Sequence, residues 1–215
     1  MTTIEELAGL PAIVDGPRRA RRTLVLAHGA GAGMEHAFME RVATGVAAEG
    51  IRVVRFEFPY MAARREGQRR GPDREPVLRA SWAGVIASLG KPERLVIGGK
   101  SMGGRYASMV ADEEGVAGVV CLGYPFHPPG QPDRLRTAHL EVMRTPTLIL
   151  QGERDSMGTS AEVEGYRLSS AVRVQWLEDG DHSLKPRKAS GHTEQGHLET
   201  AVRATVAFVR ERISG

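Results

Sequence analysis

The stretch Leu95–Arg105 reads LVIGGKSMGGR and places a serine between two pairs of glycines. The run LVIGG is continuously apolar, which is typical of a strand buried on both faces of a parallel sheet. After Ser101 comes an apolar stripe at Tyr106, Met109 and Val110, with the spacing of one helix face. A serine on a sharp strand-to-helix turn has the G-x-S-x-G pattern of an exposed nucleophile.

The two glycines of this pattern have a physical reason. A strand that turns sharply into a helix leaves little room for Cβ atoms at Gly99 and Gly103. The same turn raises the Ser101 hydroxyl above the sheet and points the first N–H groups of the helix at its reaction partner. A bare match arises by chance in a chain with 26 glycines, but the strand before it and the helix after it favour a nucleophile over a structural turn.

Outward from this motif, strand and helix patterns alternate. Further apolar runs predict strands at Thr23–Ala27, Val53–Phe58, Val116–Leu122, Thr147–Gln151 and, as an edge strand, Val172–Leu177. One-sided apolar stripes predict helices at Met34–Glu49, Met102–Asp112, Glu75–Leu89 and Glu194–Ile213. We therefore expect an α/β fold in which residues 1–215 form one domain, with a mostly parallel, doubly wound sheet and helices on both faces. The segments Pro59–Arg74 and Gly123–Pro146 are expected to be long loops.

A serine nucleophile needs a base and an acid that orients the base. His182 follows the last strand pattern, the usual place in the order Ser, Asp or Glu, His. Asp155 follows the strand pattern TLIL and lies at its carboxyl end, where it can accept a hydrogen bond from the imidazole. Glu153 is the nearby alternative, and Asp155 could instead cap a helix that begins near Ser160.

An oxyanion hole needs two N–H donors. Met102 follows the nucleophile and supplies one. The second is expected from the glycine-rich turn Ala27–Gly33, where small residues allow a close backbone approach; Ala30 is the candidate and Gly29 the next. Such a turn can also cradle a phosphate, but its glycine spacing is not that of a dinucleotide-binding loop.

Composition narrows the class of protein. A single cysteine among 215 residues excludes an intrachain disulfide and suggests a reducing compartment. No apolar run reaches the length of a membrane helix. The basic stretch Arg18–Arg22 precedes an apolar run too short for a signal peptide, so a cytoplasmic protein is expected. A net charge of +3 does not favour nucleic-acid binding, and no histidine spacing indicates a metal site.

Four segments, AHGAGAG, GGKSMGGR, LQGERD and DGDHS, resemble the α/β-hydrolase superfamily in sequence and order. The chain looks most like a small branch related to the dienelactone hydrolases and to a testis-expressed eukaryotic protein, to which the stretch GYPFHPPGQP is also similar. The resemblance implies the nucleophile Ser101, the acid Asp155 and the base His182, with Met102 and Ala30 around the oxyanion. Dienelactone hydrolases proper carry cysteine at the elbow. The chain also has no room for the large cap of many lipases.

We therefore expect a serine hydrolase of small soluble esters or thioesters, without cofactor or metal, membrane or nucleic-acid partner. Acyl transfer by the same residues and an interaction module with little turnover are the alternatives. Basic groups near the nucleophile would suit an acidic substrate, and Arg65→Ala is then expected to raise KM more for acidic than for neutral esters. The candidate substrate contacts are Lys100, Arg105, Arg65 and His127.

Overall fold

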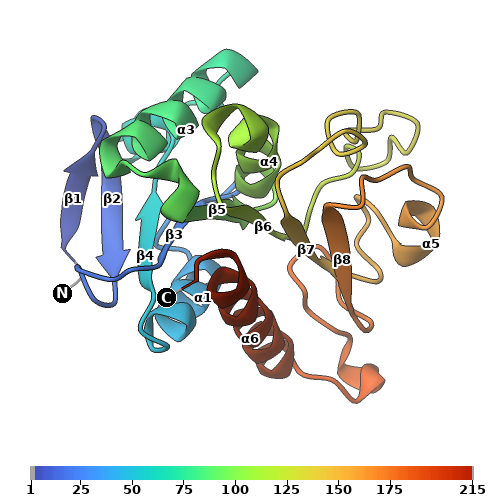
Figure 1. Cartoon of the computed structure of the whole chain (residues 1–215). Coiled ribbons are helices and arrows are strands. Elements are labelled where there is room, and N and C mark those ends of the chain that lie inside the picture. The colour runs from blue at the N-terminus through green and yellow to red at the C-terminus, as the bar shows by residue number, and fades with distance from the viewer. Residues whose placement is uncertain (1–2, 215) are drawn as a thin grey trace.

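The computed structural model describes residues 3–214, which contain an eight-stranded sheet in the order β1-β2-β4-β3-β5-β6-β7-β8 (Figure 1). From β4 to β8 in this order all neighbouring strands are parallel, and β1 and β2 are antiparallel to their neighbours. The strands are β1 (Ile4–Leu7), β2 (Leu10–Asp15), β3 (Thr23–Ala27), β4 (Arg52–Phe56), β5 (Leu95–Lys100), β6 (Gly118–Leu122), β7 (Thr147–Gly152) and β8 (Val172–Leu177).

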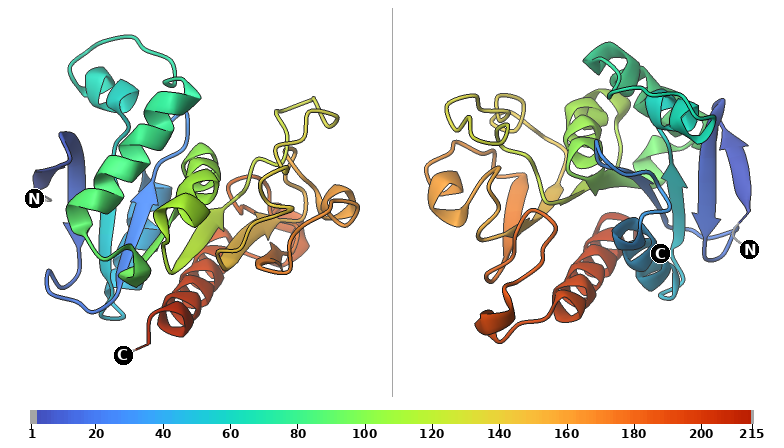
Figure 2. Two further views of the ribbon diagram at one scale, coloured as in Figure 1. Left: turned by 45° about the horizontal axis from the view of Figure 1, so that its top comes forward. Right: turned by 180° about the vertical axis from the view of Figure 1, so that it is seen from behind.

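Helices cover both faces of the sheet, as the alternating pattern predicted (Figure 2). Alternate residues of each central strand enter one of two apolar cores; in β3, Val25 packs on one side and Leu24 on the other. The first core includes α2 (Pro59–Arg65), α3 (Glu75–Leu89) and α4 (Met102–Glu114), and the second includes α1 (Ala37–Ala47) and α6 (Glu194–Arg212). The expected strands and helices are confirmed, with ends that shift by a few residues.

The N-terminal hairpin β1–β2 is not predicted from the sequence. Its two-residue turn, Ala8-Gly9, has positive φ at both positions, 53° and 75°. This is the combination that matches the twist of a tight hairpin. Alanine pays a steric cost there and gives no sequence signal for such a turn.

Two connections differ in how well they match the sequence. The segment 59–74 was expected to be a loop, but its first half is α2, which begins with Pro59 at its first position. Gly123–Pro146 contains no helix, in agreement with its prolines. The longest connection between two parallel strands, from β4 to β5, holds only α2, α3 and a short 3₁₀ turn, so no cap domain is inserted between the strands of residues 3–214. The short α5 (Ser160–Val163) precedes β8, which lies at the sheet edge.

None of the helices in residues 3–214 combines the length and the hydrophobicity needed to cross a bilayer.

Candidate active site

The turn between β5 and α4 places Ser101 in a strained conformation. Its φ and ψ are 50° and −113°, a region that residues other than glycine rarely occupy. A Cβ atom on Gly99 or Gly103 would lie 2.0 Å or 2.3 Å from the carbonyl oxygen of Ala27 in β3. Glycine at these two positions therefore lets the turn pack directly against the neighbouring strand. Strain of this kind persists where surrounding structure fixes it, and it is common at functional sites.

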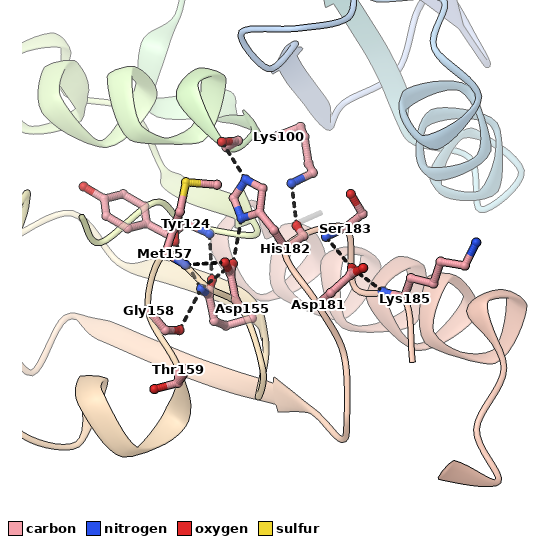
Figure 3. A network of polar contacts seen from close by, with 12 residues as sticks. Lys100, Tyr124, Asp155, Met157, Gly158, Thr159, Asp181, His182, Ser183 and Lys185 are labelled. Atoms are coloured by element: carbon pink, nitrogen blue, oxygen red, sulfur yellow. Dashed lines mark hydrogen bonds and ion pairs between the residues drawn. The ribbon is translucent and has the colours of Figure 1, made fainter. Parts of the chain in front are cut away.

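A continuous chain of hydrogen bonds runs from this serine to a buried carboxylate (Figure 3). His182 Nε2 lies 2.8 Å from Ser101 Oγ, and His182 Nδ1 lies 2.7 Å from Asp155 Oδ2. The His182 side chain is 22% exposed and that of Asp155 is fully buried. The structure thus brings together the three residues that were expected from strand ends far apart in the sequence.

Both carboxyl oxygens of Asp155 accept hydrogen bonds from residues other than His182. Gln151 Nε2 donates to Oδ2 at 2.8 Å, and the backbone N–H of Met157 donates to Oδ1 at 2.9 Å. Gln151 is fully buried and was not predicted, because an amide inside an apolar strand run has no pattern of its own. The alternatives for Asp155 are not met: Thr159 caps α5, and Glu153 accepts the N–H of Asp179.

The glycine-rich loop after β3 approaches the nucleophile closely. A Cβ atom on Gly29 would lie 3.8 Å from Ser101 Cβ, an ordinary contact distance. Met102 is the first residue of α4, and the first N–H groups of a helix have no acceptor within the helix. The N–H groups of Met102 and Ala30 therefore belong to the two backbone segments that adjoin Ser101.

A cavity of about 620 Å³ opens over Ser101 between α1, the segment 181–185 and α6. Its lining combines apolar side chains with charged groups. The residues that line it include Gly29, Ala30, Phe38, Met39, Arg41, Lys100, Ser101, Met157, Asp181, His182, Lys185, Glu194 and Leu198.

Lys100 is a predicted contact that does reach the cavity. Its Nζ donates to the carbonyl oxygen of His182 at 2.5 Å and lies 5.7 Å from the centre of the Phe38 ring. Burial lowers the pKa of Lys100 to about 8, although the nearby charges of Asp155 and Asp181 act in the opposite direction. A Cβ atom on Gly123 would lie 2.5 Å from this carbonyl oxygen, so glycine there leaves room for the contact.

The other three predicted substrate contacts do not line the cavity over Ser101. Arg65 forms ion pairs with Glu57 and Glu35. The guanidinium of Arg105 lies over the ring of Tyr106, 4.8 Å from its centre. His127 is 2% exposed, with its Nδ1 2.9 Å from the carbonyl oxygen of Pro128. Each side chain is engaged within the fold, a difference that loop position and charge alone could not reveal.

A second serine–histidine pair lies farther along α4. His139 Nε2 is 2.9 Å from Ser108 Oγ, but this hydroxyl donates to the carbonyl oxygen of Arg105 at 2.7 Å. His139 Nε2 must then donate, so the nitrogen that faces Ser108 has no lone pair with which to accept the serine proton. Burial and the charge of Arg105 lower the pKa of His139 to about 4. Ser108 is 4% exposed, so this pair is a structural counterpart to the one at Ser101.

A family model described as an alpha/beta hydrolase domain matches residues 20–210. The chain belongs to this family. Among solved structures, the hydrolase is similar to TT1662 from Thermus thermophilus, with 20% identity over 100% of this chain and 98% of that one, and a TM-score of 0.70. XC6422 from Xanthomonas campestris, a serine hydrolase without a lid, has 17% identity over 100% and 96% of the chains and a TM-score of 0.70. A dienelactone hydrolase from Anabaena variabilis has 18% identity over 99% and 97% and a TM-score of 0.72.

Proposed function

We propose that this alpha/beta hydrolase cleaves small esters or thioesters through a covalent acyl-enzyme on Ser101. The observation that carries the proposal is the unbroken contact series from Ser101 Oγ through His182 to Asp155, at 2.8 Å and 2.7 Å. This series ends in the open cavity, where a carbonyl group can approach the hydroxyl. It has the roles of nucleophile, base and orienting acid that acyl transfer requires.

In the proposed first step Ser101 Oγ attacks the substrate carbonyl carbon while His182 Nε2 takes the hydroxyl proton. Asp155 accepts a hydrogen bond from Nδ1 and stabilises the imidazolium that forms. The N–H groups of Met102 and Ala30 would stabilise the oxyanion. As the tetrahedral intermediate collapses, His182 gives its proton to the departing alcohol or thiol. Water, deprotonated by the same imidazole, then releases the acid and regenerates Ser101.

The shape of the cavity supports a small or partly exposed substrate. It is open, and no cap domain covers it in the described part of the chain. Apolar side chains such as Phe38 and Leu198 suit a short acyl or alkyl group, and charges at Arg41, Lys185 and Glu194 suit a polar remainder. The solved serine hydrolase without a lid shares this fold.

A fluorophosphonate probe followed by intact-mass measurement tests the proposal without a known substrate. Wild type is expected to gain one adduct and Ser101→Ala none, because only an activated hydroxyl displaces fluoride from phosphorus. Ser108→Ala is the matched control: it removes a serine that also contacts a histidine, at 2.9 Å, and should label like wild type. A folded wild type that gains no adduct would overturn the proposal and favour an interaction module. Product analysis with alcohol acceptors separates acyl transfer from hydrolysis.

A further inference from the structure

Two buried side chains hold the peptide units on both sides of Ala30. The carbonyl oxygen of Gly29 lies 2.7 Å from His28 Nδ1 and accepts a second bond from Tyr60 Oη at 3.2 Å. The same hydroxyl proton is shared with the carbonyl oxygen of Ala30, at 3.0 Å, in a three-centre hydrogen bond. His28 and Tyr60 are both fully buried. None of these contacts involves the nucleophile or its base.

Because a peptide unit is planar, the contacts to the Gly29 carbonyl also set the direction of the Ala30 N–H. The Gly29–Ala30 bond is trans, so its C=O and N–H groups lie in one plane and point in opposite directions. Fixing the Gly29 carbonyl on one side therefore fixes the Ala30 N–H on the other. The next unit begins at the Ala30 carbonyl, which Tyr60 also holds. With both planes held, the Ala30 N–H cannot turn about its flanking dihedrals without breaking one of these bonds.

The protonation of His28 follows from its partners. The backbone N–H of Phe58 can only donate, and it lies 3.1 Å from His28 Nε2, which must carry a lone pair. The Gly29 carbonyl can only accept, so Nδ1 must carry the proton. Burial lowers the pKa of His28, which favours this neutral form. A second proton, on Nε2, would face the N–H of Phe58 and break the contact.

Tyr60 is itself held at the start of α2. Its backbone N–H donates to Asp73 Oδ2 at 2.8 Å, and Arg64 Cζ lies 5.2 Å from the centre of its ring. Burial raises the pKa of the Tyr60 phenol, so the hydroxyl stays a proton donor at ordinary pH. The segment after β4 thus reaches across to the loop after β3 and fixes its carbonyl groups.

We propose that His28 and Tyr60 are positioning residues that aim the Ala30 N–H at the oxyanion formed on Ser101. The purpose of this arrangement rests on the proposed acyl-enzyme chemistry. The arrangement itself, which we call the clamp, consists of the hydrogen bonds from His28 and Tyr60 to the carbonyl oxygens of Gly29 and Ala30. In the ground state the clamp makes no contact with substrate. Its effect is therefore expected in the transition state, where the donor must already point at the developing charge.

Tyr60→Phe tests the clamp by removing one hydroxyl and no ring atom. Outright loss of an oxyanion donor costs about 10²–10³ in rate, and a donor that is only less well aimed should cost about tenfold. With p-nitrophenyl acetate we expect kcat to fall about tenfold and KM to stay within about twofold. Inactivation by the fluorophosphonate should slow by a similar factor, because its phosphoryl oxygen needs the same donors.

Tyr106→Phe is the matched control, since Tyr106 is also buried, at 8% exposure, and its hydroxyl makes no hydrogen bond within residues 3–214. It should keep wild-type kcat and inactivation rate. A folded Tyr60→Phe with unchanged kcat and inactivation rate would overturn the positioning role. A rise in KM alone would also overturn it, because that result indicates substrate binding rather than aim.

Nitrogen-15 NMR of histidine-labelled protein tests the other half of the clamp independently of activity. At pH 7 we expect the His28 signal to show a directly bonded proton on Nδ1 and none on Nε2. A proton on Nε2 would overturn the assignment. This measurement remains informative if wild type is neither labelled nor active, a result that would reject the proposed function and not the clamp.

Discussion

The loop 27–34 and the loop 179–185 both adjoin Ser101, and different groups hold them. The first is fixed through its backbone by buried side chains: Tyr60 binds its carbonyl groups, and Glu57 accepts the N–H of Met34 at 3.2 Å. In the second, Asp181 accepts the N–H groups of Ser183 and Lys185, and His182 is held through its ring by Asp155 and through its carbonyl by Lys100. Both loops therefore have backbone groups held, and the second also has the ring of His182 oriented by a carboxylate.

The two tasks explain this difference. An oxyanion donor is a backbone N–H, and only the orientation of its peptide plane decides where it points. A general base must accept a proton and return it, so its ring needs a fixed tautomer and a nearby negative charge. We therefore expect substitutions in the second loop to act on proton transfer and those around the first loop to act on oxyanion stabilisation.

Asp155→Asn is expected to cause the largest loss of activity. Both carboxylate oxygens accept hydrogen bonds, from Gln151 Nε2 and Met157 N–H, so an amide group must oppose a donor with its own NH₂. The imidazole then loses its acceptor and its tautomer, and kcat should fall about 10⁴-fold. Ester turnover measures the loss.

Asp112→Asn is the control for this change, because Asp112 also accepts backbone N–H bonds, from Arg144 and Thr145, away from the cavity. It should lower stability without a comparable loss of kcat. A loss below about tenfold in a folded Asp155→Asn variant would show that Asp155 does not orient the base.

Lys100→Met tests the hydrogen bond from Lys100 Nζ to the carbonyl oxygen of His182. The variant keeps an unbranched chain but loses the donor to the His182 carbonyl, so at His182 itself the contact of the ring with Asp155 remains. A hydrogen bond from a charged group contributes about 1.5–3 kcal/mol, and the loss of half of this from the transition state lowers kcat by about 4- to 13-fold. Steady-state kinetics of both proteins at pH 7 measures the change, and an unaltered kcat would contradict it.

The pH dependence of stability checks the state of this lysine. The pKa of Lys100 is about 8 in the folded protein and 10.5 for an unperturbed lysine. Between these pH values the unfolded chain therefore binds more protons than the folded protein. Stability contributed by the wild-type lysine therefore rises with pH across this window. The free energy of unfolding of wild type minus that of Lys100→Met should increase between pH 8 and 10.5 by more than about 1.4 kcal/mol, the value of one pKa unit. Urea unfolding measures this difference, and a constant value would contradict burial of the ammonium.

The same comparison shows what sequence patterns can predict. The parallel strands and the turn at Ser101 were predicted from local patterns, and Asp155 and His182 were chosen because each follows a strand at the edge where the strands end. These signals depend on local order along the chain. The glycines of residues 27–33 are the signal from which a second oxyanion donor was expected.

The groups that hold the site were not predictable in this way. Glu57 lies inside the run Val53–Phe58, Tyr60 comes shortly after it, and Gln151 ends the run Thr147–Gln151, so none of the three has a pattern of its own. Their partners are backbone groups and carboxylates that only the fold brings near. Conversely, Arg105 and His127 are conspicuous in the sequence, yet contacts within the fold occupy them. Candidate reacting residues can be identified from sequence patterns. The residues that hold them in place are identified only when the structure shows which groups they contact.

Arg65→Ala is expected to have the smallest effect on substrate choice. The sequence alone predicts that this substitution raises KM more for acidic than for neutral esters. In the structure Arg65 Nη2 lies 2.9 Å from Glu57 Oε1, and the Glu57 side chain is 2% exposed. Removal of the arginine leaves a buried carboxylate, so we expect a loss of about 2 kcal/mol in unfolding free energy, less than for a fully buried pair. The ratio of KM values for acidic and neutral esters should stay unchanged.

Arg41→Ala is the comparison variant, because Arg41 lines the cavity, is exposed, and forms no ion pair within residues 3–214. It should leave stability unchanged and raise KM for acidic esters by about threefold relative to neutral ones, as expected for one exposed charge contact worth less than about 1 kcal/mol. A selective rise in KM for acidic esters in Arg65→Ala would instead show that the arginine leaves Glu57 to meet the substrate. The first loop would then be held less firmly than its hydrogen bonds indicate, because Glu57 also binds Met34.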